Sequence, residues 1–243
     1  MTAASLEIVP AASFGEVVAA RLADRLVARP SLVVCLPTGR TPLPLYERLP
    51  AAVAARSASL AGATVVLLDE YLGLPAGHGA RCDTVLRREV IDRSDPPPRF
   101  VPFDVDRADP PEACAAVDAA IAANGGLDLV ILGLGANGHV GMNEPGAAPD
   151  APTRVVELAA STREAARGYG ADPPPSHGVT VGMAAIAAAR EIWLLATGTA
   201  KAAILARTVD GPISVEVPAS LLRPHAGLRI IADDAAAAAL RRR

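Results

Sequence analysis

The fold of this chain is constrained most strongly by an alternation of short apolar runs with longer amphipathic stretches. Each run is almost continuously apolar and rich in Val, Ile and Leu, which is typical of parallel strands covered on both faces. The runs span residues 31–36, 63–68, 127–132, 191–196 and 228–232. Strands that alternate with helices favour a parallel sheet. We therefore predict an α/β fold: a single doubly wound, Rossmann-like, mostly parallel sheet with helices on both faces.

Amphipathic stretches of helical length separate these runs. They span residues 14–28, 112–123 and 201–209, and a further helical pattern begins at Leu43. Two proline-rich stretches, 95–102 and 172–175, are predicted to be stiff loops and not linkers, because the alternation resumes after each of them. We expect residues 1–243 to form a single domain.

The composition excludes several classes of protein. Hydrophobic residues make up 51% of the 243 residues, which argues against disorder, and the net charge of −3 gives no general attraction to nucleic acids or anionic membranes. The three cysteines are widely spaced and form neither a zinc motif nor a readable disulfide framework. The sequence shows no signal-peptide pattern and no apolar run long enough to cross a membrane. We expect a cytoplasmic protein.

Polar motifs follow four of the five predicted strands. They read PTGRTP, DEY, GLGANGH and TGTAK, after the strands that begin at residues 31, 63, 127 and 191. In open parallel sheets, ligands bind beyond the carboxyl ends of the strands. We therefore expect the four motifs to meet at one edge of the sheet and to form a ligand site there.

Two of these motifs favour an anionic ligand. Gly39, Arg40 and Thr41 form a turn that leads into a helix, and a helix N-terminus directs N–H groups and a positive dipole at an anion. An ordinary connection, with Thr41 as N-cap and Pro42 as the first helical residue, explains the same residues. Lys201, the only lysine in the chain, falls in a first helical turn, where a cation is unfavourable unless an anion binds beside it. The alternative is a solvated surface lysine.

The other two motifs carry groups suited to proton transfer. Asp69 is either a solvated or helix-capping carboxylate or, in a partly dry site, a proton carrier with a raised pKa. In the segment LGLGANGHVGMNEPG, residues 132–146, His139 and Glu144 are five residues apart. An imidazole beside a carboxylate is an oriented acid/base pair at neutral pH. The plainer alternative is a glycine-rich turn that contains an isolated histidine.

Taken together, these motifs resemble the glucosamine-6-phosphate deaminase family, within the glucosamine-6-phosphate isomerase/6-phosphogluconolactonase superfamily. The matching segments are PTGRTPLPLY, LLDEYLGL, LGLGANGHVGMNEPG, SHGVTVG, ATGTAKA and VPASLLRPH, which cover nearly the whole chain in order. The NEPG ending of the third segment points to the deaminase branch. The resemblance implies that glucosamine 6-phosphate is converted to fructose 6-phosphate and ammonia, as part of amino-sugar catabolism, without a metal or organic cofactor.

The resemblance also implies catalytic residues. His139 would open the sugar ring as an acid/base group held by Glu144, and Asp69 would move a proton between C2 and C1 of the sugar. Asn137 stands where many family members have Asp. Its side chain cannot act as a base but can hydrogen-bond the imidazole, so Glu144 is expected to carry the charge stabilisation.

For the substrate phosphate, the resemblance implies the backbone of Gly39, Arg40 and Thr41 together with Lys201. Arg40 stands where a glycine is common in the family. An arginine of the lid region also binds phosphate in the family, and the candidates here are Arg167 first and then Arg163, since the local alignment slips by one residue.

Three other functions stay open at this stage. One is a deaminase of another amino-sugar phosphate, such as galactosamine 6-phosphate, because the epimer depends on the shape of the pocket. Another is a 6-phosphogluconolactonase-type hydrolase, against which the NEPG segment argues. A non-catalytic sugar-phosphate sensor would need a DNA-reading module, and no basic recognition helix is visible. We expect a small sugar phosphate as ligand, no nucleic-acid or membrane partner, and a monomer or small homo-oligomer.

Overall fold

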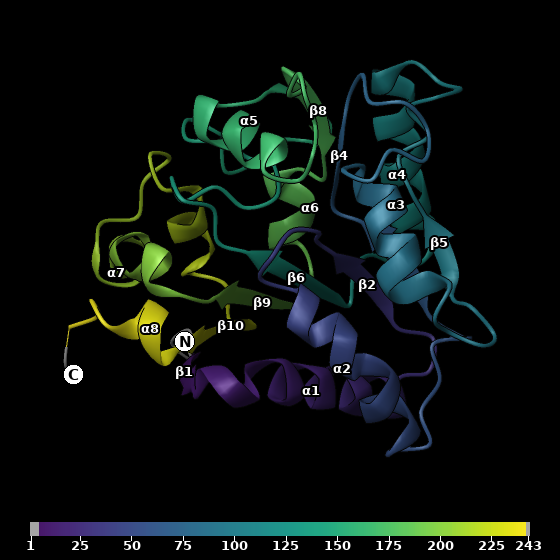
Figure 1. The fold of residues 1–243 in the computed structure, drawn as a ribbon, viewed down its shortest axis with the longest axis horizontal. Coiled ribbons are helices and arrows are strands. Elements are labelled where there is room, and N and C mark those ends of the chain that lie inside the picture. Colours follow the sequence, from purple (N-terminus) through teal and green to yellow (C-terminus); the bar gives the residue numbers. More distant parts are fainter. Residues whose placement is uncertain (1–4, 242–243) are drawn as a thin grey trace.

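A seven-stranded sheet forms the centre of the computed structural model, which describes residues 5–241 (Figure 1). The strands in spatial order are β1 (Ser5–Val9), β10 (Leu228–Asp233), β9 (Glu191–Ala196), β6 (Leu129–Gly133), β2 (Val33–Leu36), β3 (Thr64–Leu67) and β5 (Arg99–Val101). Every pair of neighbouring strands in this sheet is parallel. The predicted α/β class with a doubly wound, mostly parallel sheet is thus confirmed.

The five strands predicted from apolar runs are β2, β3, β6, β9 and β10, and both edge strands were missed. β5 lies inside the stretch 95–102, so the prediction of a loop there was wrong for residues 99–101. An edge strand pairs on one side only, as β5 does with β3 and β1 does with β10. Such a strand needs neither a continuous apolar run nor freedom from flanking prolines.

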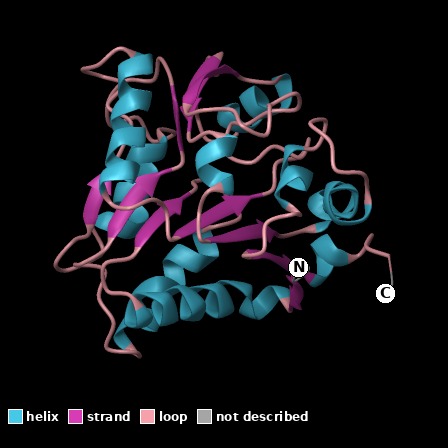
Figure 2. Ribbon diagram, turned by 180° about the vertical axis from the view of Figure 1, so that it is seen from behind, coloured by secondary structure: helices cyan, strands magenta, loops and turns pink. Residues whose placement is uncertain are grey.

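Helices cover the sheet on both faces. α1 (Phe14–Ala28) and α2 (Leu43–Ala54) lie together below the sheet in Figure 1, whereas α6 (Met183–Ala187) lies above it, and Figure 2 shows the same layers from behind. The remaining α-helices are α3 (Cys82–Leu86), α4 (Pro110–Ala123), α5 (Ala160–Arg167), α7 (Ala202–Asp210) and α8 (Asp234–Ala237). Short 3₁₀ or π turns are η1 (Ala11–Ser13), η2 (Arg87–Ile91), η3 (Thr199–Lys201) and η4 (Pro218–Leu222). No helix of the described part is both long and apolar enough to span a bilayer.

The helical pattern that begins at Leu43 is confirmed, because Leu43 is the first residue of α2. The N-cap is Pro42, so the alternative with Thr41 as N-cap and Pro42 as the first helical residue is wrong by one position. A proline at this point still fits, because its missing N–H is not needed in the first turn. Lys201 closes the 3₁₀ turn η3 and is the N-cap residue of α7.

A second, three-stranded antiparallel sheet was not predicted. β4 (Asp69–Tyr71) follows β3 almost directly and pairs with β8 (His177–Thr180), which in turn pairs with β7 (Arg154–Glu157). In Figure 1 these strands stand above the main sheet, next to α5. The small sheet therefore holds the acidic motif after β3 in an extended strand and brings the chain around α5 over the end of the main sheet.

The crossing of α1 over α2 depends on a close approach at Gly15. A Cβ atom added at Gly15 would lie 2.5 Å from the carbonyl oxygen of Pro44, which is backbone and cannot rotate away. In an open helical position, Ala is about 1 kcal/mol more favourable than Gly. Overpacking of a tight contact costs about 1–3 kcal/mol and outweighs that gain.

We predict that Gly15→Ala lowers the free energy of unfolding by about 1–2 kcal/mol, measured by denaturant unfolding. Gly79→Ala is the matched control, because a Cβ there has nothing within 4 Å. Equal stability of the two variants would show that the two helices separate without strain.

Candidate active site

A cavity of about 430 Å³ opens at the carboxyl ends of the central strands. Its lining includes Gly39 and Arg40 after β2, Asp69 after β3, His139 after β6 and Lys201 after β9. The four polar motifs of the sequence therefore meet at one edge of the sheet. The strand order explains this convergence, since β3, β2, β6 and β9 are consecutive neighbours and run in one direction.

Asp69 is a buried carboxylate at the base of the cavity, with 8% of its surface exposed. Burial raises the pKa of Asp69 from its ordinary value of 3.8 to about 6, while His139 and the thiol of Cys82 pull the pKa back down. A carboxylate desolvated in this way is ionised at neutral pH and still holds a proton readily, as a group that accepts and returns protons must.

His139 and Glu144 form a hydrogen-bonded pair beside Asp69. The Nδ1 atom of His139 lies 3.2 Å from a carboxylate oxygen of Glu144, and this oxygen also accepts a hydrogen bond of 2.8 Å from the Asn137 amide. The other Glu144 oxygen accepts bonds from the Thr162 hydroxyl and from the Ala159 N–H. Glu144 is therefore held on both oxygens.

This pairing keeps Glu144 a carboxylate and favours one tautomer of His139. Although burial raises the pKa of Glu144, its bonds with His139, Thr162 and Asn137 hold that pKa at about 2. A permanent carboxylate at Nδ1 favours a proton on that nitrogen, which leaves Nε2 as the atom free to exchange protons with a ligand. His139 lines the cavity, and Asn137 accepts the backbone N–H of His139 at 3.1 Å.

Two glycines of the segment 132–146 are required by these side chains. A Cβ on Gly135 would lie 2.3–2.4 Å from three atoms of the His139 ring. Gly141 has a φ of +58°, and a Cβ there would lie 2.9 Å from the Thr180 hydroxyl and 3.4 Å from a carboxylate oxygen of Asp69. The glycine-rich pattern is thus a matter of space around the acid/base groups.

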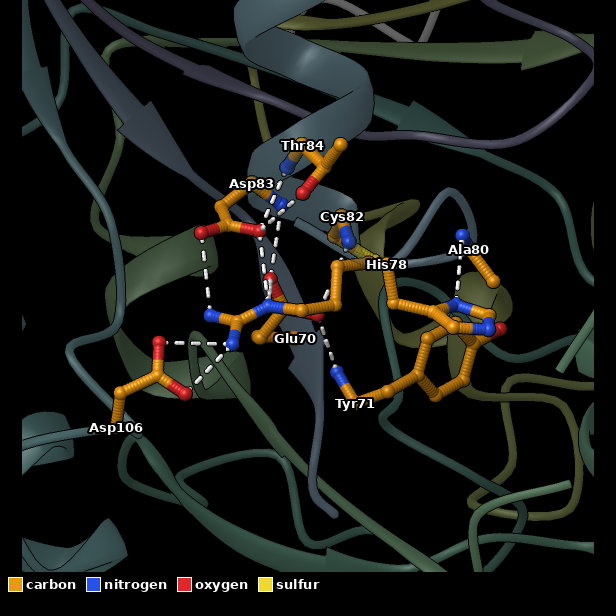
Figure 3. A network of polar contacts seen from close by, with 9 residues as sticks. Glu70, Tyr71, His78, Ala80, Cys82, Asp83, Thr84 and Asp106 are labelled. Atoms are coloured by element: carbon orange, nitrogen blue, oxygen red, sulfur yellow. Dashed lines mark hydrogen bonds and ion pairs between the residues drawn. The ribbon is translucent and has the colours of Figure 1, made fainter. Parts of the chain in front are cut away.

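Glu70, the neighbour of Asp69, is turned into the protein and anchors the start of α3 (Figure 3). One of its carboxylate oxygens accepts the N–H groups of Tyr71 at 2.8 Å and Cys82 at 3.0 Å, and the other accepts that of Asp83 at 2.8 Å. Burial raises the pKa of Glu70, and the three N–H donors act in the opposite direction. These bonds fasten the end of β4 to the first turn of α3, which lines the cavity through Cys82.

Arg81 completes the same network from a fully buried position. Its guanidinium binds the Asp106 carboxylate at 2.7 and 2.8 Å and the Asp83 carboxylate at 3.0 and 3.1 Å, and lies 3.8 Å from Glu70. In Figure 3, dashed lines lead from the carboxylates of Asp83 and Asp106 to the same side chain. A charge with only 1% of its side chain exposed is thereby paired on each side.

Three basic side chains line the cavity. Lys201, Arg40 and Arg88 all line it, and burial lowers the pKa of Lys201. Arg88 also pairs with Glu89 at 2.7 Å, whereas no carboxylate of the described chain lies within ion-pair distance of Lys201 or Arg40. Unpaired cations beside a turn with a positive-φ glycine, Gly39 at +102°, form a suitable place for an anion.

The predicted lid arginines do not reach this place. Arg167 is half exposed and its guanidinium pairs with Glu164 at 2.5 Å, and neither Arg167 nor Arg163 belongs to the cavity lining. The segment that contains α5 contributes smaller and aromatic side chains to the lining. These are Ser161, Thr162, Ala165 and Tyr169.

Sequence reasoning missed several lining residues, above all Arg88, Cys82 and Tyr169. Arg88 and Cys82 follow the DEY motif at a distance and reach the cavity because Glu70 and Arg81 fold α3 back over it. No local pattern in the sequence indicates this return of the chain.

Among the described residues, no group of three or more His, Cys, Asp or Glu is placed to hold a metal ion.

The fold and the cavity define an α/β protein with an acid/base pair, a buried carboxylate and basic side chains in one cavity at one edge of the sheet. The family model for "Glucosamine-6-phosphate isomerases/6-phosphogluconolactonase" matches residues 9–231. The chain belongs to this family, and the resemblance seen in the motifs is confirmed.

Relatives within the family cover almost the full chain. A glucosamine-6-phosphate deaminase of Streptomyces avermitilis is 41% identical over 239 residues, which is 96% of this chain and 92% of the relative. One of Rhodopirellula baltica is 39% identical and covers 98% of this chain and 96% of the relative.

Solved structures show the same fold. A monomeric glucosamine-6-phosphate deaminase superposes with a TM-score of 0.92 at 29% identity, over 97% of this chain and 99% of its own. A 6-phosphogluconolactonase of Thermotoga maritima gives a TM-score of 0.75 at 20% identity, over 95% of this chain and 99% of its own, and is a likeness of fold alone.

The raised pKa of Asp69 predicts how the free energy of unfolding depends on pH. The folded protein holds this proton more tightly than the unfolded chain, so burial of the carboxylate costs nothing below about pH 4 and its full amount above about pH 6. Asp69→Asn should therefore raise the free energy of unfolding by up to about 3 kcal/mol at pH 8 and change it little at pH 4. A gain of the same size at both pH values, or an Asp69 carboxyl that titrates near pH 4 by ¹³C NMR, would contradict this.

Proposed function

We propose that this protein converts glucosamine 6-phosphate to fructose 6-phosphate and ammonia by an aldose–ketose isomerisation. The observation that carries the proposal is the cavity itself. A buried carboxylate, Asp69, and an oriented pair, His139 with Glu144, share one cavity of about 430 Å³ with the unpaired cations Lys201 and Arg40. The names of the relatives, which are about 40% identical over the full length, support the same activity.

His139 is proposed as the group that opens the sugar ring. Its Nε2 takes the proton of the anomeric hydroxyl and returns a proton to the ring oxygen as the C1–O5 bond breaks, giving the free aldehyde. The Glu144 carboxylate stabilises the imidazolium that forms in between, and Asn137 keeps that carboxylate in place.

Asp69 is proposed to carry the proton of the isomerisation. As a carboxylate it removes the proton from C2, beside the C1 aldehyde, while the aldehyde oxygen takes up a proton, and an enolamine is left. It then returns its proton to C1, and the nitrogen at C2 gives up one proton, which balances the one taken up by the oxygen and leaves a ketimine at C2. Water hydrolyses the ketimine, so one water is consumed for each ammonia that leaves. With a pKa of about 6, Asp69 is ionised before the first step and strong enough as an acid for the second.

The turn before α2 and the basic side chains that line the cavity are proposed to hold the phosphate. The N–H groups of Gly39, Arg40 and Thr41, just before α2, and the ammonium of Lys201 are the donors. Arg167, which pairs with Glu164 outside the lining, keeps a phosphate role only if the end of α5 moves on binding.

We also propose a cytoplasmic enzyme that works as a monomer or small homo-oligomer. Its three cysteines are free and buried, as is usual in a reducing compartment. The solved deaminase with a TM-score of 0.92 is described as monomeric.

The proposal is tested by assaying ammonia and fructose 6-phosphate from glucosamine 6-phosphate, with galactosamine 6-phosphate and a phosphogluconolactone in parallel. We predict equimolar products from the gluco substrate, and a loss of kcat on the order of 10²–10⁴ in Asp69→Asn with substrate binding retained. Binding is measured by calorimetry. Turnover of the lactone alone would make the protein a hydrolase, and an equal loss of binding and turnover in Asp69→Asn would make Asp69 structural.

For the phosphate end we predict that Lys201→Ala raises KM for glucosamine 6-phosphate about tenfold or more, with a smaller fall in kcat. The ammonium loses a charge-assisted hydrogen bond to phosphate, which is worth about 1.5–3 kcal/mol. Arg163→Ala, outside the lining, is the control for loss of a nearby positive charge. An unchanged KM in Lys201→Ala would show that Lys201 is a solvated surface lysine and does not bind the phosphate.

A further inference from the structure

The side chain of Tyr169 lies on the proposed phosphate turn. Its hydroxyl lies near the backbone N–H of Arg40, which lowers the pKa of the phenol against the effect of burial. The same hydroxyl would lie 3.3 Å from a Cβ placed on Gly39. Both Tyr169 and Arg40 line the cavity, although they come from segments far apart in sequence. The phenol is thus beside the N–H groups that the proposed function assigns to the anion.

The ring of Tyr169 also holds the guanidinium of Arg40. The guanidinium carbon lies 5.8 Å from the ring centre, within the range of a cation–π contact. The end of α5 touches the same side chain, since a Cβ on Gly168 would lie 3.5 Å from an Arg40 nitrogen. No carboxylate of the described residues pairs with Arg40, so its charge stays available to a ligand.

The Tyr169 hydroxyl keeps a proton to give. Its oxygen lies near the Arg40 N–H, and among the described residues no acceptor is hydrogen-bonded to its O–H. Burial raises the pKa of Tyr169, so the phenol stays protonated at neutral pH. It therefore offers one O–H donor beside the turn of Gly39 and the Arg40 guanidinium.

We propose that Tyr169 is a phosphate-binding residue, whose O–H donates to a phosphate oxygen of the substrate while its ring steers the Arg40 guanidinium to the same anion. The inference rests on the proposed function, because it requires a phosphorylated substrate. It moves the contribution of the α5 segment from the predicted arginine, Arg167, to a tyrosine two residues further on.

The hydroxyl of Tyr169 could instead block the phosphate site, and removing it would then have the opposite effect on phosphate binding. If Tyr169 only occupied the N–H of Arg40 and had to be expelled by phosphate, its removal would tighten binding. If it donates, removal weakens binding. Tyr169→Phe separates the two roles, because the variant keeps the ring against Arg40 and loses only the hydroxyl.

The experiment measures inorganic phosphate, by calorimetry and as a competitive inhibitor, and KM for glucosamine 6-phosphate, in wild type, Tyr169→Phe and Lys201→Ala. We expect Tyr169→Phe to weaken phosphate binding and raise KM about tenfold, the size of one hydrogen bond to a charged group. The effect on KM should exceed that on kcat, and the melting temperature should equal that of wild type. Loss of a merely structural contact would instead lower the melting temperature.

Unchanged or tighter phosphate binding in Tyr169→Phe, with weakened binding in Lys201→Ala, would overturn the inference and leave the proposed function in place. If wild type neither binds phosphate nor releases ammonia, the proposed function fails and the inference falls with it. Calorimetry needs no turnover, so the two failures are told apart.

Discussion

The site depends most on the hydrogen bonds that the carboxylate of Glu70 accepts. Glu70 sits in β4 next to Asp69, and successive residues of a strand face opposite ways. Glu70 therefore faces the protein and Asp69 faces the cavity. Glu70 is satisfied by three N–H groups and lies near Arg81, whereas Asp69 has little to offset its burial. The two adjacent side chains of one strand therefore lie in different environments: Glu70 anchors α3, and Asp69 faces the cavity, where we propose that it acts as the base.

The two sheets divide the work of assembling this cavity. Parallel strands of the main sheet deliver the ends of β2, β3, β6 and β9 to one edge. The antiparallel sheet β4–β8–β7 then carries the chain over that edge and supports α5, from which Thr162 reaches back to Glu144. The acid/base pair is accordingly held by Asn137 after β6 and by Thr162 of α5.

Much of the fold and of the site was predictable because its signals are local. Apolar runs indicate the central strands. Because these strands are parallel, the motifs directly after them lie at one edge of the sheet. Asp69, His139 and Lys201 were placed in the cavity lining in this way. Edge strands β1 and β5 lack such runs, since one ladder suffices for them.

The rest depends on contacts between distant segments. Arg88 and Tyr169 reach the cavity only through the fold-back of α3 and the path of the chain after α5, which no spacing in the sequence encodes. The assignment of Arg167 came from a resemblance whose alignment slips by one residue, and on a helix one residue turns a side chain by 100°.

The chain's only lysine has a further consequence: all of its side-chain amine chemistry is concentrated inside the cavity. Reagents that couple through lysine, harmless on proteins with many surface amines, would here attach at the mouth of the site, so immobilisation or labelling of this protein has to proceed through other groups.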